Sequence, residues 1–195
     1  MSSGSTYDDA AAGNYQDLPQ GNFIRCLVLS PGSGSDPLAC ELQTVDLDKQ
    51  PDFEAISYVW GSDVKSETIS CNGRTTYITA NLSAALKRVR YASEPRSLWA
   101  DSICIDQKND KEKSHQVALM GKIYSCSRRT LIHIIGNDNG HAASVQSLVS
   151  LLDKSINHEL NKIDPENDYV SLLLAQPWFH RGWVIQEAVL AKDAV

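Results

Sequence analysis

The stretch SLWADSICIDQKNDKEKSHQVALMGKIYSCSRRTLIHIIG, residues 97–136, decides the fold of this chain. Its first part, 97–107, is a mostly apolar run that is typical of an interior parallel strand. A helix is predicted near 111–125, where apolar residues recur at helical spacing. A second buried strand follows over 129–136. Strands that alternate with helices in this way indicate an α/β fold with a parallel sheet.

The chain before this stretch predicts more strands, a hairpin and another helix. Three segments are interpreted as strands: FIRCLVL (23–29), LACELQTVDL (38–47) and FEAISYVWG (53–61). Residues 67–79 predict a β-hairpin, because Asn72-Gly73 is the favoured two-residue turn. Asn81 is predicted to cap the helix that follows. We therefore expect a mostly parallel sheet flanked by helices, with a β-hairpin insertion.

The two ends of the chain differ in pattern. Residues 1–20 are small, polar and unpatterned, which predicts a disordered leader before a single domain over 21–195. Apolar spacing predicts a further helix from Ser144 and a short helix after KIDPENDY, 162–169. The segment RGWVIQEAVLA, 181–191, is predicted to form a closing helix.

Composition limits the function classes. The chain has 195 residues, of which 42% are hydrophobic, so it can bury the core of one globular domain. A net charge of −6 argues against non-specific nucleic-acid binding, which needs a basic face. Five scattered cysteines without a CxxC pair indicate a reduced, cytoplasmic protein. We find no signal peptide and no apolar run long enough to span a membrane.

The end of one predicted strand carries candidate binding residues. Tyr58, Trp60 and Gly61 lie at the carboxyl end of the strand FEAISYVWG. In open α/β sheets, ligands bind in the crevice beyond these strand ends. The aromatic side chains could therefore line a site, and the alternative is that they belong to the core.

Asp101 is predicted to lie in a buried strand, where its carboxylate needs a partner. An arginine, backbone amides or a ligand would serve, and we expect a structural role. Asp106 or Asn109 is predicted to cap the helix that follows. The aspartates are not spaced as in an EF-hand, and the five histidines form no zinc pattern, so we predict no metal site.

Glu187 stands in the nearly all-apolar closing helix. On a helical wheel it shares a face with Trp183 and Leu190, so little of it would face water. Desolvation raises the pKa of a carboxyl group, as in carboxylates that perform acid–base or charge-stabilising work. The alternative interpretation is a buried salt bridge with Arg181 or Arg128.

Three blocks resemble the fungal heterokaryon-incompatibility (HET) domain family. They are AISYVWG (55–61), LWADSICIDQKNDKEKSHQVALMGKIYSCS (98–127) and RGWVIQEAVLA (181–191). Both the order and the contents of the blocks match, and the similarity runs from about residue 23 to the end of the chain. The long central block is the most specific of the three.

The resemblance has implications for the fold and the chemistry. HET domains are similar in plan to TIR domains, which have a flavodoxin-like parallel sheet flanked by helices. Some TIR domains cleave NAD with a glutamate in a W-C-x-x-E pattern, and Trp183 and Glu187 stand at the same distance here. Val184 replaces the cysteine, and the predicted hairpin has no TIR counterpart, which puts the activity in doubt.

The resemblance also implies roles for individual residues. Glu187 would be catalytic, stabilising the positive sugar formed when the nicotinamide–ribose bond breaks. The implied substrate-binding residues are Tyr58, Trp60, Gly61, Arg181 and Trp183. The two tryptophans would stack on a base or wall the pocket, and Arg181 would pair with a phosphate.

We therefore expect a cytoplasmic cell-death effector domain with NAD as substrate and no resident cofactor. Expected partners are further copies of the chain on activation and an upstream sensor domain or protein, but neither nucleic acid nor a membrane span. HET domains commonly begin longer proteins, so the chain is expected to be part of one. The rival hypothesis is a non-catalytic signalling module that acts by self-association or partner docking.

Overall fold

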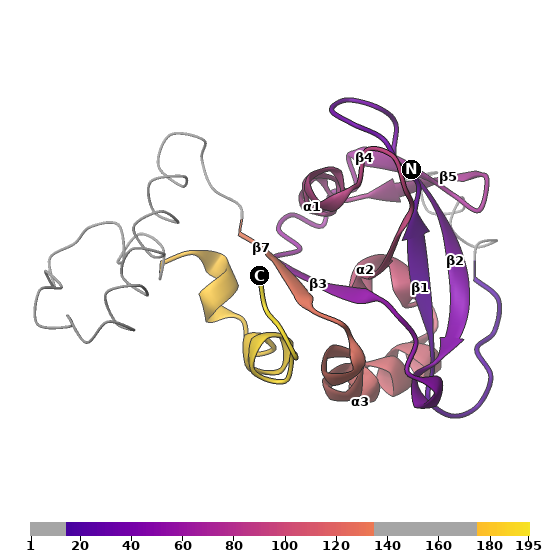
Figure 1. Ribbon diagram of the computed structural model, residues 1–195, viewed down its shortest axis with the longest axis vertical. Helices are drawn as coiled ribbons and strands as arrows, with labels where there is room; N and C mark the ends of the chain where they lie inside the picture. Colours follow the sequence, from indigo (N-terminus) through magenta and orange to yellow (C-terminus); the bar gives the residue numbers. More distant parts are fainter. Residues whose placement is uncertain (1–14, 135–174) are drawn as a thin grey trace, which may run out of the picture. The chain divides into compact units, whose positions relative to one another are not determined.

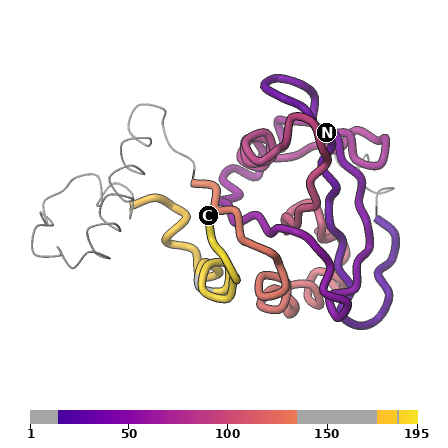
Figure 2. Tube along the Cα trace, in the orientation of Figure 1, coloured from indigo at the N-terminus to yellow at the C-terminus, as the bar shows by residue number. Residues whose placement is uncertain are grey.

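The computed structural model describes residues 15–134 and 175–195, which belong to two compact units. One unit runs to His133 and includes Ile185–Val195, and the other is Ile134–Val184. Each unit is described by itself. The first unit contains the sheet and its helices, and its path is traced from indigo to yellow in Figure 2.

A seven-stranded mixed sheet forms the centre of the first unit (Figure 1). Its strands are β1 (Phe23–Leu29), β2 (Ala39–Asp46), β3 (Glu54–Tyr58), β4 (Glu67–Cys71), β5 (Arg74–Ile78), β6 (Arg96–Trp99) and β7 (Thr130–His133). They lie in the order β5-β4-β2-β1-β6-β3-β7. The predicted α/β sheet and the β4–β5 hairpin are both confirmed.

Pairing directions divide this sheet. β3 runs parallel to its neighbours β6 and β7, and β2 runs parallel to β4. β1 is antiparallel to both β2 and β6, and β4 is antiparallel to β5. A bridge between Thr130 and Ala194 adds a parallel pairing at β7, so among the described residues four pairings are parallel and three are antiparallel.

β3 is the strand on which the site is built, and every one of its residues is buried. Helix α1 (Ala80–Val89) packs against β3 and β4, and α3 (Asp110–Cys126) lies on the opposite side of β3 (Figure 1). The ring of Tyr124 on α3 meets Trp99 edge-to-face with centroids 5.7 Å apart.

The helix starts correct one prediction and confirm another. Thr79, and not Asn81, caps α1, because its hydroxyl accepts a hydrogen bond from the Leu82 amide. Asn81 is already inside the helix, and its side chain donates to the Val59 carbonyl at 3.0 Å. Asn109 caps α3 as predicted, accepting from the Glu112 amide at 3.1 Å.

The strand predicted over 97–107 is much shorter than expected. β6 ends at Trp99, and the chain turns into the short helix α2 (Asp101–Cys104). The Cys104 amide donates to the Ala100 carbonyl at 2.8 Å, which closes the helical turn. Asp101 and a following serine favour a helix start over a strand, and this local preference outweighs the apolar pattern.

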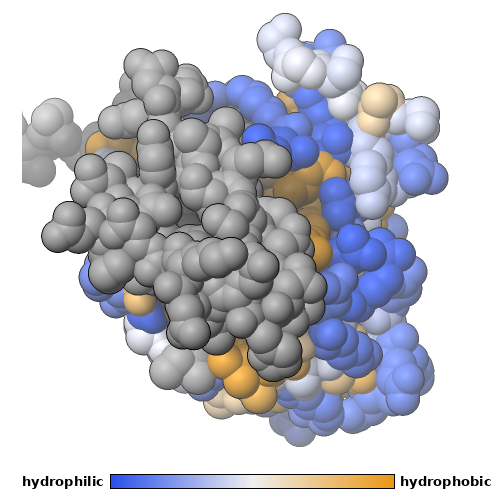
Figure 3. Space-filling view, turned by 60° about the vertical axis from the view of Figure 1, so that its left-hand side comes forward, coloured by the Kyte–Doolittle hydropathy of each residue, from blue (hydrophilic) through white to orange (hydrophobic). Residues whose placement is uncertain are grey.

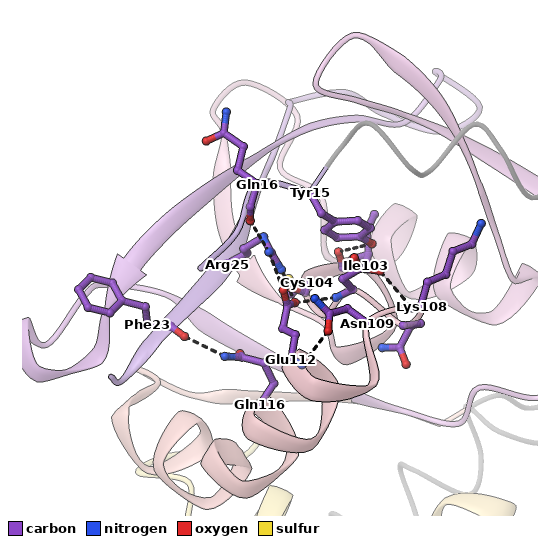
Figure 4. Close-up of polar contacts among 12 residues, drawn as sticks. Tyr15, Gln16, Phe23, Arg25, Ile103, Cys104, Lys108, Asn109, Glu112 and Gln116 are labelled. Atoms are coloured by element: carbon purple, nitrogen blue, oxygen red, sulfur yellow. Dashed lines mark hydrogen bonds and ion pairs between the residues drawn. The ribbon is translucent and has the colours of Figure 1, made fainter. Parts of the chain in front are cut away.

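A buried arginine, Arg25, contacts Tyr15 and Gln16 at the start of the described chain (Figure 4). Arg25 on β1 is 2% exposed and forms an ion pair with Glu112 at 2.5 Å. It also donates to the Gln16 carbonyl at 2.5 Å and lies 5.0 Å from the centroid of the Tyr15 ring. The described part of the predicted leader therefore contacts the domain, while residues 1–14 lie outside the described residues.

The end of the chain returns to the sheet. Beside β7, the Thr130 amide donates to the Asp193 carbonyl at 2.7 Å, and the Val195 amide donates to Thr130 at 2.9 Å. The predicted helices from Ser144 and after 162–169 lie outside the described residues. In the described ranges, none of the helices has the length and apolar character to cross a membrane.

Candidate functional site

Glu187 is held against strand β3. It lies in η4 (Ile185–Val189), a single π-helical turn, and only 1% of it is exposed. The Ser57 hydroxyl on β3 donates a hydrogen bond to its Oε2. η4 packs against α3. Gly121 on α3 leaves room for the Leu190 side chain, because a Cβ at position 121 would lie only 3.4 Å from Cδ1 of Leu190. The prediction that Glu187 is buried is confirmed.

The closing helix is shorter than predicted, which changes its faces. A π-helical turn bonds i to i+5, so the helical-wheel grouping of Glu187 with Trp183 and Leu190 does not apply. Trp183 lies in a turn before η4, and both it and Leu190 are 45% exposed. The carboxylate is therefore buried where η4 packs against α3 and meets Ser57 of β3, and not by an apolar face of a long helix.

A second polar group lies beyond the carboxyl ends of β3 and β6. The Trp60 indole N–H donates to both carboxylate oxygens of Asp101, at 2.9 and 3.0 Å. The Tyr58 and Ser102 hydroxyls lie 2.5 Å apart. Asp101 also accepts from the Ser102 amide at 2.8 Å. A backbone amide, that of Ser102, is one of the partners predicted for Asp101. The Trp60 indole is a second partner, which was not predicted.

Strand alternation separates these two groups. Ala55 pairs with Trp99 in register, and Trp99 packs on α3, so the face of β3 with Ala55 and Ser57 is the α3 face. Tyr58, next along the strand, points to the opposite face. The structure thus brings Tyr58, Trp60 and Asp101 together on one side, and Ser57 with Glu187 on the other. Trp60 follows Ser57 by three residues, about 11 Å of extended chain at most; a shared cleft for Trp60 and Glu187 stays a prediction.

The backbone conformation and close packing at position 61 explain why Gly61 is a glycine. Its φ of +72° lies in the left-handed region, and a Cβ there would come 2.3 Å from Nδ2 of Asn81. The same Asn81 amide group holds the Val59 carbonyl. Gly61 therefore allows the chain to turn closely over the start of α1 after β3, and this accounts for the glycine without a ligand.

Two clefts in the first unit lie away from Glu187. One of about 500 Å³ lies between residues 17–21 and the start of α3, and one of about 390 Å³ lies beside β4. Neither is lined by a predicted site residue. Arg181 and Trp183 belong to the second unit, whose described part includes the short helix η3 (Pro177–His180).

Arg128, which was considered as a salt-bridge partner of Glu187, contacts two other carboxylates. Its Nη2 lies 3.1 Å from Glu54 Oε1, and its Nε lies 3.9 Å from Asp52 Oδ1. Arg96 and Arg129 approach the same Glu54 at 2.5 and 3.4 Å. Burial alone would raise the pKa of Glu54, but the hydrogen bonds and charges of Arg96 and Arg128 outweigh it and hold that pKa below its usual value.

Two features extend the candidate site beyond the sequence prediction. Ser57 was not predicted, although a serine in a strand whose residues are all buried is a signal that a partner faces it. His133 pairs with Tyr58 in register, and burial, then the charge of Arg88, lowers its pKa. Within 15–134 and 175–195, no group of three His, Cys, Asp or Glu side chains is placed to hold a metal ion.

The surface near the end of the chain carries exposed apolar residues. Val189 is 72% exposed and follows Glu187 by two residues, and Val64 is 68% exposed in the loop after β3. Figure 3 shows hydrophobic surface next to strongly hydrophilic surface on the face that it presents. The buried carboxylate thus lies within a turn that also presents apolar side chains to solvent.

Comparisons with known proteins agree with this arrangement of blocks. Residues 53–187 match the family described as Heterokaryon incompatibility protein (HET). This range starts just before β3 and ends at Glu187. The chain is also 27% identical, over 249 aligned positions, to heterokaryon incompatibility protein 6, OR allele, of Neurospora crassa. All of this chain is covered, but it spans only 37% of that relative's length. No solved structure matches the chain significantly. Since the family match takes in more than half of the sequence, the chain belongs to the heterokaryon incompatibility (HET) family.

Proposed function

We propose that this chain is an effector domain of fungal heterokaryon incompatibility that triggers cell death by cleaving NAD, with Glu187 as the catalytic carboxylate. The incompatibility role is supported by the family match and by the Neurospora relative. The chemical step is supported by one observation above all. A carboxylate that is 1% exposed receives a hydrogen bond from Ser57 of β3, two residues before the loop after that strand begins.

Glu187 has the properties that the reaction requires. Breaking the nicotinamide–ribose bond releases neutral nicotinamide and leaves positive charge on the ribose, which a carboxylate in a low-dielectric site stabilises strongly. Water then adds to the sugar carbon and loses a proton, giving ADP-ribose. The Ser57 hydroxyl fixes the orientation of the carboxylate, so little reorganisation is needed when the charge develops.

The loop after β3 would supply the rest of the site. The Trp60 ring is fixed by two hydrogen bonds to Asp101, so its face is set in one orientation. A fixed indole face is a stacking surface for a nucleobase or a nicotinamide ring. For the carboxylate and the ring to serve one substrate, NAD must lie around the end of β3, because Ser57 and Tyr58 point to opposite faces.

Nicotinamide release from NAD tests the proposal directly. The purified chain would be assayed alone and clustered by fusion to a tetrameric coiled coil, since HET domains are expected to act as oligomers. We expect release in the clustered sample and its loss in Glu187→Gln. Glu41→Gln is the matched control, because Glu41 lies exposed on β2 and the same chemical change there should leave release unaltered. No release from a folded, clustered wild-type chain would refute the chemical step.

A second candidate function has its own supporting observation. In this alternative the buried carboxylate supports a binding module rather than a reaction, because its hydrogen bond with Ser57 holds η4 on β3. The exposed apolar side chains at the end of η4 would then contribute to a docking surface. In that case incompatibility would survive in a chain without measurable NAD cleavage, and Val189→Asp would abolish it.

A further inference from the structure

Two cysteines face each other where the β-hairpin joins the rest of the sheet. Cys40 on β2 and Cys71 on β4 are register partners in the parallel ladder. They are 3% and 1% exposed, and both carry free thiols. A hydrogen bond between the two thiols raises the pKa of Cys40 and lowers that of Cys71. Paired positions on neighbouring strands point to the same face of the sheet, so the two side chains are neighbours on that face.

We propose that Cys40 and Cys71 are an oxidation site, at which hydrogen peroxide forms a disulfide that joins the β4–β5 hairpin to β2. Neighbouring strands lie about 4.8 Å apart, and a disulfide requires Cα atoms about 4.4–6.8 Å apart. Paired positions on neighbouring strands point to the same face of the sheet, so both Cβ atoms start from the same side. The backbone thus meets the main geometric condition for a bond.

The two thiols are suited to different steps. Cys71 accepts the hydrogen bond from Cys40, which lowers its pKa and favours its thiolate despite burial. Cys40 is the donor of that bond and is buried, so its pKa is raised. In the first step, the Cys71 thiolate attacks an oxygen of the peroxide; an S–O bond forms, the O–O bond breaks, and hydroxide leaves and becomes water. In the second step, the Cys40 sulfur loses its proton and attacks Cys71; the S–S bond forms, the S–O bond breaks, and a second water leaves. Both sulfurs are oxidised and one peroxide is reduced to two waters.

The position of Cys71 gives the oxidant a way in. It is the last residue of β4, directly before the exposed turn Asn72-Gly73, both of whose φ values are positive. The ladder between β2 and β4 contains only two register pairs, Ala39 with Ser70 and Cys40 with Cys71. A short ladder beside a turn opens at low free-energy cost, and peroxide is small enough to enter through such an opening.

Other pairs of cysteines are less suited to this chemistry. Burial raises the pKa of Cys104 to about 12, so its thiol stays protonated, and burial also raises the pKa of Cys26. Cys126 is only partly buried at the end of α3 and serves as a control thiol. A disulfide between Cys40 and Cys71 would close a loop of about thirty residues, a size at which cross-linking stabilises a fold appreciably.

Mass spectrometry of the oxidised 195-residue chain tests the site. The reduced chain would be treated with hydrogen peroxide, alkylated under denaturing conditions, and digested with trypsin and then with a protease that cleaves before aspartate. This digest separates Cys40, in 36–45, from Cys26, and it places Cys71 in 66–74. We expect these two peptides linked, and three of the five cysteines alkylated. Cys71→Ser and Cys40→Ser should each abolish the link, and Cys126→Ser should retain it.

A melting measurement adds a second readout. The oxidised chain should melt roughly 5–10 °C higher than the reduced chain, and a phosphine reductant should reverse the shift. If Cys71→Ser fails to fold by circular dichroism, Cys71→Ala takes its place. The proposal is overturned if the linked peptides contain Cys26 or Cys104 instead, or if the folded wild type keeps all five thiols alkylatable after the peroxide treatment.

Discussion

Two buried glutamates lie at opposite ends of one strand and have different surroundings. Glu54 begins β3, and Glu187 binds Ser57 near the other end of the strand; each glutamate is 1% exposed. Three guanidinium groups approach Glu54, and the Ser57 hydroxyl donates a hydrogen bond to Glu187. A carboxylate enclosed by arginines has its charge already satisfied, which is suited to holding strands together. Ligands bind beyond the carboxyl ends of parallel strands. We therefore place the proposed NAD cleavage at the Ser57 end of β3.

The arginines around Glu54 also connect separate segments. Arg96 begins β6 and donates to the Val89 carbonyl at the end of α1, while Arg129 precedes β7 and approaches Asp193 at 3.8 Å. Strands β6 and β7 are the two neighbours of β3. Glu54 thus fixes the parallel part of the sheet at its amino-terminal edge, and this leaves the other edge available for a site.

Glu54→Gln should have the largest effect on stability. The substitution leaves the Arg96 side chain, which is 10% exposed, beside a neutral amide, and removing one partner of a largely buried pair is costly because the other charge remains. We expect the free energy of unfolding to fall by about 3 kcal/mol. Urea unfolding followed by circular dichroism measures this, with the exposed Glu41→Gln as control. A Glu54→Gln chain as stable as wild type would remove the contrast between the two glutamates.

Glu187→Gln should show the opposite pattern. Glutamine keeps the volume and can still accept from Ser57, so we expect an unchanged or higher melting temperature, because the desolvation cost of the charge disappears. Nicotinamide release should fall about a hundredfold or more, the scale for losing one charge-stabilising group. Both are measured on the same preparation. If Glu187→Gln melts at a lower temperature than wild type but keeps full turnover per folded molecule, Glu187 has a structural role like that of Glu54.

Asp101→Ala sharpens the comparison at the loop. The substitution removes both hydrogen bonds from the Trp60 indole and the bond from the Ser102 amide, which predicts a loss of about 2 kcal/mol. Turnover per folded molecule should fall less than in Glu187→Gln. Trp60→Phe is the companion variant, because it removes the same indole bonds but keeps an aromatic ring. A fully stable, inactive Asp101→Ala chain would instead assign Asp101 to the site.

The pH dependence of stability should give the smallest effect. The pKa of Glu54 and that of Glu112 are held below their usual value of 4.5 in the folded chain, so the unfolded chain takes up protons first as the pH falls. Their stabilisation is complete above about pH 5 and is lost as the pH falls through the folded pKa values. Protonation leaves the shape of the glutamate side chain unchanged. We therefore expect the free energy of unfolding to fall less at low pH than it does in Glu54→Gln.

Unfolding measured from pH 7 to pH 3 checks this dependence. The decline should be shallower in Glu54→Gln, which has lost one of the two groups. An acid limb of identical slope in wild type and Glu54→Gln would show that the arginine cluster does not hold the pKa of Glu54 down.

Several elements could be predicted from the sequence because their determinants are local. The β4–β5 hairpin follows from Asn72-Gly73, whose positive φ values few other pairs adopt easily. The start of α3 follows from the Asn109 cap. Each of these depends on residues within a few positions of one another, so a single stretch of sequence contains the whole signal.

What surrounds each buried carboxylate was decided by the tertiary structure. Ser57 and Glu187 are 130 residues apart, and Arg128 reaches Glu54 only because β3 and β7 pair side by side. The apolar pattern of 97–107 likewise could not reveal that the strand ends at Trp99. Register between distant strands and the face that each residue presents are set by packing of the whole sheet. For this chain, sequence therefore determined most of the strands, the hairpin turn and the family, and only the fold determined which partner each charge would meet.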